Sequence, residues 1–140
     1  MDRRVVITGL GVCAPNGVGL TDFTNALREG KSGIRYQTKL RELNFGCQVA
    51  AEPLIKDNLL NNYFTPLQLK GLNATGIVYG VIAGLDAWSD AGLEKSNSST
   101  PSWERGVLFG TGILGVDKFR ESIYLLDEKK VRRLGSTTVL

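Results

Sequence analysis

The feature that most constrains the fold is an unbroken β-branched run near the N-terminus, Val5-Val6-Ile7-Thr8, which ends at Gly9. A strand with one face in water alternates apolar and polar side chains, whereas a run without alternation is typical of a strand buried on both faces. Such strands occur in parallel sheets that helices cover on both sides. The run therefore predicts a central strand of an α/β fold with a mainly parallel sheet.

The rest of the chain alternates helix and strand signals. The expected elements are a helix from Thr21 to Gly30, a strand over residues 45–51, a loop or ragged helical turn over 57–63, a strand over 106–110 and a helix over 116–129. Thr21 offers a side-chain oxygen to the free N–H groups of the first helix, and Gly30 is placed to end it. Alternation of this kind is typical of an α/β fold.

A long glycine-containing helix is expected in the middle of the chain. Thr65-Pro66-Leu67-Gln68 combines a Thr cap, Pro at the first helical position and Gln three residues after the cap. The helix would run to about Ala91, before Gly92, and it carries glycine at positions 71, 76, 80 and 84. Each glycine costs about 1 kcal/mol relative to alanine in a helix interior. Close packing against another backbone would offset that cost, so a long buried helix is expected.

The composition narrows the class of protein. A chain of 140 residues has the size of one domain, and its 42% hydrophobic and 22% charged residues are typical of a soluble globular protein. A net charge of +3 suits an acidic partner without indicating nucleic acid binding. The N-terminal apolar run is too short for a signal peptide, and the longest uncharged stretch, residues 71–85, is too short to span a bilayer. We therefore expect a cytoplasmic protein without a membrane segment.

The absence of histidine removes the commonest general base and the commonest metal ligand. The two cysteines, Cys13 and Cys47, lie far apart without a histidine partner, so they indicate neither a zinc site nor a disulfide framework. We interpret both as small apolar residues of an intracellular protein. These residue types predict no catalytic residue, no cofactor and no metal site.

Two glycine motifs resemble dinucleotide-binding fingerprints. Residues 9–14 fit G-x-G-x-x-A after an expected strand, but Pro15 prevents a helix from following directly to bind a pyrophosphate. A structural turn is therefore expected there. Residues 110–115 form a fuller match between a strand and a helix, although the acidic partner would fall at Asp127 or Glu128. A small dinucleotide-binding module built on residues 110–115 stays open as an alternative.

Several segments, in order and spacing, carry a resemblance to one family. They are residues 3–11 (RRVVITGLG) with Pro15, residues 27–34 (LREGKSGI), residues 80–93 (GVIAGLDAWSDAGL), residues 106–115 (GVLFGTGILG) and residues 136–139 (STTV). The chain resembles the N-terminal portion of the beta-ketoacyl-acyl carrier protein synthases. The resemblance spans the whole chain and is weakest between residues 36 and 63. It implies a thiolase-like fold, a layered α/β/α/β/α arrangement, of which residues 1–140 would form the first part.

The resemblance implies a condensing enzyme, an acyltransferase that extends acyl chains by decarboxylative Claisen condensation in fatty acid or polyketide synthesis. In the family, a nucleophilic Cys and two His residues lie beyond the segment that matches residues 136–139. Neither Cys13 nor Cys47 aligns with that nucleophile. The chain alone is therefore expected to be inactive, either as the N-terminal part of such an enzyme or as a non-catalytic partner similar to the chain-length factors.

The resemblance also implies contacts with an acyl chain and with a carrier protein. Ile113 matches the family position that gates the acyl channel, and Leu114 stands where the family commonly has glycine, which would favour short or unusually shaped chains. The expected contacts with an acidic acyl carrier protein are Lys70, Lys129, Lys130, Arg132 and Arg133. A solvated helix end explains the last four equally well. A homodimer or a hetero-partner is expected, without nucleic acid or membrane contact.

Overall fold

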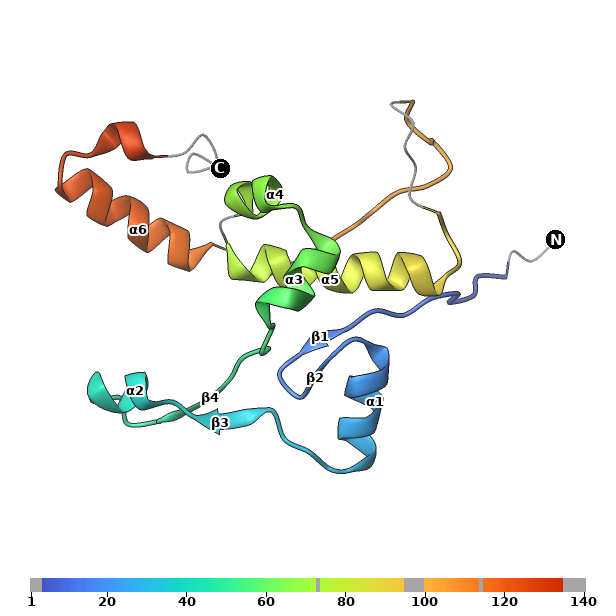
Figure 1. The fold of residues 1–140 in the computed structure, drawn as a ribbon, viewed down its shortest axis with the longest axis horizontal. Coiled ribbons are helices and arrows are strands. Elements are labelled where there is room, and N and C mark those ends of the chain that lie inside the picture. The colour runs from blue at the N-terminus through green and yellow to red at the C-terminus, as the bar shows by residue number, and fades with distance from the viewer. Residues whose placement is uncertain (1–3, 73, 95–99, 114, 135–140) are drawn as a thin grey trace.

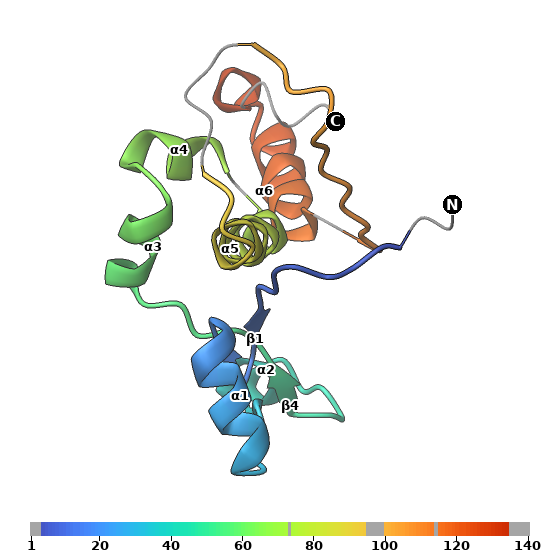
Figure 2. The same ribbon diagram turned by 90° about the vertical axis from the view of Figure 1, so that its right-hand side faces the viewer.

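Figure 1 shows the fold in a computed structural model, which describes residues 4–72, 74–94, 100–113 and 115–134. In chain order the elements are β1 (Cys13–Ala14), β2 (Gly17–Val18), α1 (Leu20–Arg28), β3 (Ile34–Tyr36), α2 (Thr38–Glu42), β4 (Val49–Ala51), α3 (Asp57–Tyr63), α4 (Pro66–Gly71), α5 (Thr75–Asp90), α6 (Val116–Asp127) and the 3-10 helix η1 (Val131–Arg133). Helix α5 runs across the centre, with α1 and the β1–β2 hairpin below it and α6 beyond its N-terminal end. Figure 2 looks along α5 and shows α3 and α4 on a different side of it from α6.

The N-terminal segment before β1 packs directly on α5. A Cβ atom at Gly11 would lie 2.5 Å from the Ala87 nitrogen and closer still to the Ala83 carbonyl oxygen. The N–H group of Leu10 donates a 2.9 Å hydrogen bond to the Asp90 carboxylate. A close backbone approach is expected at the glycines of this helix. It occurs instead where Gly11 of the N-terminal segment faces Ala83 and Ala87 of α5.

The glycines of α5 accommodate an aromatic ring. A Cβ atom at Gly84 would lie 3.0 Å from the Phe109 ring, and one at Gly80 would lie 3.5 Å from it. The Phe109 ring therefore lies against Gly80 and Gly84, where α5 has no side chain that would occupy the same space. The small residues of α5 thus allow two segments that are far apart in the sequence, residues 9–11 and the segment of Phe109, to pack on this helix.

Several local helix signals are confirmed. Thr65 and Gln68 form the expected capping box, with Thr65 Oγ1 accepting from the Gln68 N–H at 3.3 Å and Gln68 Oε1 accepting from the Thr65 N–H at 2.8 Å. Gly30 and Gly92 follow helices α1 and α5 with φ of 64° and 69°, as expected for C-terminal glycines. The helix predicted from Thr65 to Ala91 is nevertheless wrong as one element. It divides into α4 and α5, because the backbone leaves the helical conformation at Leu72 (φ −90°, ψ 77°).

Two more helix expectations are corrected. Thr21 lies inside α1, whose N-cap is Gly19 with φ of 86°, so the Thr21 hydroxyl does not mark the start of that helix. Residues 57–63, expected as a loop or ragged turn, form helix α3, and Asp57 in its first turn is favourably placed for the helix dipole.

The mainly parallel sheet predicted from the β-branched run is wrong for the described part of the chain. There, β1 pairs with β2 and β3 pairs with β4, both as antiparallel two-stranded sheets. Residues 5–8 and 106–110 lie outside any strand, and Val5 and Leu108 are 92% and 99% exposed. A strand forms only where a second strand shares its hydrogen bonds, and within the described ranges neither segment has such a neighbour.

The core of the described residues is small. Its buried apolar side chains are Ala26, Phe64, Ala74 and Ile82. Ile82 is the one member of this set that lies in α5, so the helix is central but half-buried, and the expectation of a long buried helix is corrected accordingly. None of the helices in the described ranges has the length and apolar character that a membrane span requires.

Candidate functional site

The turn before α6 lies beside a small apolar cavity. This cavity, about 280 Å³ in volume, is lined by Gly76, Ile77, Gly80 and Val81 of α5 and by Phe109, Gly110 and Thr111. Ile113, the expected gate of the acyl channel, does not line it and is 83% exposed. Leu114 and residues 136–139 lie outside the described residues. Residues 109–111, just before Ile113 in the chain, therefore line the cavity, but the Ile113 side chain does not.

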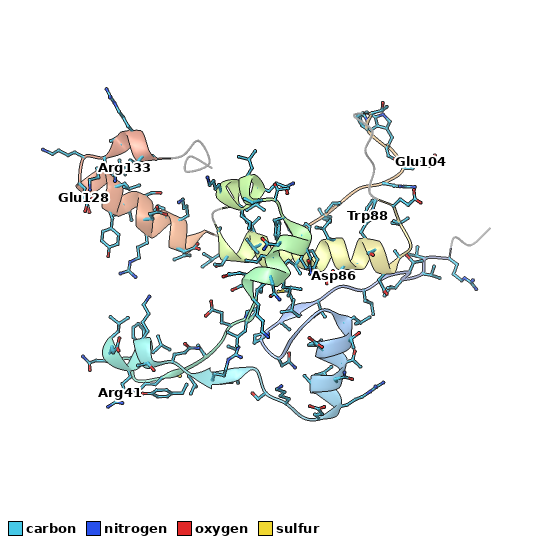
Figure 3. The ribbon with its side chains drawn as sticks, in the orientation of Figure 1. Arg41, Asp86, Trp88, Glu104, Glu128 and Arg133 are labelled. Atoms are coloured by element: carbon cyan, nitrogen blue, oxygen red, sulfur yellow. The ribbon has the colours of Figure 1, made fainter. Side chains whose placement is uncertain are left out.

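The cations expected to contact a carrier protein occupy two separate places. Lys70 is exposed in the last turn of α4. The other four are Lys129 and Lys130, which follow α6, and Arg132 and Arg133 in η1. Lys130 forms a 2.6 Å ion pair with Glu128, which lowers the net positive charge there. Figure 3 shows Glu128 and Arg133 at the outer end of α6, away from α4, so the structure does not bring Lys70 together with the other cations.

A polar cluster joins α3, α5 and β1. Tyr63 Oη donates a 2.8 Å hydrogen bond to Asp86 Oδ1. Burial, and then this hydrogen bond, raises the pKa of Tyr63 to about 12. Burial, and then the Asp86 carboxylate, also raises the pKa of the Cys13 thiol. Cys13 is therefore a protonated thiol at neutral pH, and thiols in that form are poor nucleophiles.

A larger cavity, about 600 Å³ in volume, is polar and lies between the β1–β2 hairpin, α1 and the segment around α3. Its lining mixes the carboxylates Asp22 and Glu29 with the cations Lys31, Arg35 and Lys56. The Arg35 guanidinium is engaged by main-chain carbonyl oxygens, one of them that of Pro15 at 3.4 Å. Because the lining carries both carboxylates and cations, it indicates neither an anionic nor a cationic ligand.

Neither glycine motif has the geometry of a dinucleotide site. In residues 9–14, the Leu10 N–H is bonded to Asp90 and the segment packs on α5 before it leads into β1. The structural turn expected at these residues lies instead at Pro15 and Asn16, between β1 and β2. Residues 110–115 precede α6 but follow no strand of the described part, and Asp127 lies at the far end of that helix. Among the described residues, no three His, Cys, Asp or Glu side chains gather in a way that could hold a metal ion.

Comparison with known proteins decides the family. Residues 2–139 match the beta-ketoacyl synthase N-terminal domain. The chain belongs to the beta-ketoacyl synthase family. It is 38% identical over 119 residues to 3-oxoacyl-acyl-carrier-protein synthase 2 of Coxiella burnetii, a match that covers 81% of this chain and 26% of that protein. For the synthase of the same name from Vibrio harveyi the identity is 33% over 133 residues, or 95% and 31% of the two chains.

The beta-ketoacyl synthase relatives also include polyketide enzymes. The putative polyketide beta-ketoacyl synthase 1 of Streptomyces halstedii is 28% identical over 135 residues, which are 91% of this chain and 29% of that protein. The chain thus spans less than a third of the length of these relatives. Family membership confirms the resemblance found in the sequence and implies a thiolase-like fold for this chain.

The Tyr63–Asp86 hydrogen bond and both cavities could not be predicted from the sequence. Tyr63 and Asp86 are 23 positions apart. The one sequence signal that could have indicated their contact is a helical pattern over residues 57–63, which form α3. Both cavities lie between separate segments of the chain, and the hydrophobic period of a segment does not show which other segment it contacts.

Proposed function

We propose that this chain supplies the N-terminal part of a cytoplasmic condensing enzyme, which extends acyl chains by decarboxylative Claisen condensation in fatty acid or polyketide synthesis. The observation that carries the proposal is the family match over residues 2–139, together with 38% identity to a 3-oxoacyl-acyl-carrier-protein synthase. The proposal includes the layered α/β/α/β/α arrangement and assembly with a second, identical or related, subunit.

In this proposal the chain contributes binding surfaces and no reacting group. It contains no histidine, and the raised pKa of Cys13 makes that thiol a poor nucleophile. We therefore assign no catalytic residue to residues 1–140. Ile113 and Leu114 would border the acyl chain, and Lys70, Lys129, Lys130, Arg132 and Arg133 would contact the acyl carrier protein.

The exposed apolar side chains support a role inside a larger protein body. Val5, Ile7, Leu108 and Phe109 are 92%, 84%, 99% and 60% exposed. Soluble proteins that act as isolated monomers rarely leave large apolar areas in water. In the proposed enzyme, further protein would cover these side chains and would carry the nucleophile.

A chimera tests the proposal directly. Residues 1–140 replace the matching part of the Coxiella burnetii synthase, and condensation of acyl and malonyl carrier substrates is measured. We expect the chimera to condense, whereas the 140-residue chain alone should not, because it has no general base of the histidine type and no activated thiol. A folded chimera without activity, or turnover by the repurified chain alone, would contradict the proposal.

The assignment of Ile113 is tested in the same chimera. Ile113→Phe should lower kcat/KM for long acyl chains and leave the shortest substrates nearly unchanged, because a larger side chain limits depth and not chemistry. The measurement is the profile of kcat/KM against acyl chain length. A proportional loss at every length would show packing damage and would remove Ile113 from the acyl pocket.

A further inference from the structure

We draw no further inference here: the strongest candidate, the exposed apolar face of α6 that is formed by Val116, Phe119, Ile123 and Leu126, carries none because nothing in the structure shows what covers it.

Discussion

Gly11→Ala should destabilise the fold strongly, because the added methyl group has no space. Its Cβ atom would lie 2.5 Å from the Ala87 nitrogen and closer still to the Ala83 carbonyl oxygen, and both are backbone atoms of α5 that no rotamer change can move. The segment must then lift off α5. Overpacking of this kind costs about 1–3 kcal/mol, and loss of the Leu10 hydrogen bond to the Asp90 carboxylate adds about 1 kcal/mol.

The expected loss of unfolding free energy is therefore about 2–4 kcal/mol. For a chain of this size, 1 kcal/mol corresponds to a shift in Tm of about 3 °C, so Tm should fall by about 6–12 °C. Thermal unfolding followed by far-UV circular dichroism measures this shift. Gly46→Ala is the matched control, because a Cβ atom there meets no described heavy atom within 4 Å, and it should change stability by less than about 0.5 kcal/mol. Equal melting temperatures for the two variants would refute the packing argument.

Two more predictions concern hydrogen bonds of single side chains. Thr65→Ala removes the capping box of α4 and should cost about 1 kcal/mol in urea unfolding, whereas Thr21→Ala, inside α1, should cost clearly less; equal losses would contradict the role of the cap. The pKa of Tyr63, raised to about 12 from about 10 in the unfolded chain, gives stability that is fully present below pH 10 and is lost as the pH rises toward 12. Unfolding free energies at pH 9 and 11 should therefore fall more steeply for wild type than for Tyr63→Phe, and parallel slopes would count against the Tyr63–Asp86 bond.

Features encoded within a few residues could be predicted from the sequence. The capping box needs only the atoms of Thr65 and Gln68, and the glycines after α1 and α5 need only a left-handed φ, so neighbouring residues decide both. The beginning of α6 was predicted on the same basis, from apolar spacing after a glycine turn. The family could also be predicted, because its motifs are contiguous segments that occur in this chain in the same order and spacing.

Features that depend on distant partners could not be predicted in this way. The run at residues 5–8 has a strong preference for strand, but a strand also needs a neighbour, and within the described residues these side chains meet none. The site shows the same limit. The Tyr63–Asp86 bond and the cavity beside Phe109 are both created by α5, whose position relative to the other segments no local pattern specifies.

The hydrogen bond between Leu10 and Asp90 has a consequence for synthesis on the ribosome. The two residues are 80 positions apart, and a ribosome that adds about 5–20 residues per second needs about 4–16 s to cover that interval. Throughout those seconds the segment around Leu10 has left the site of synthesis but has no α5 on which to pack. Residues 9–11, whose backbone packs on α5 in the folded chain, are then uncovered, so the yield of folded protein should depend on how fast the message is translated through the codons for α5.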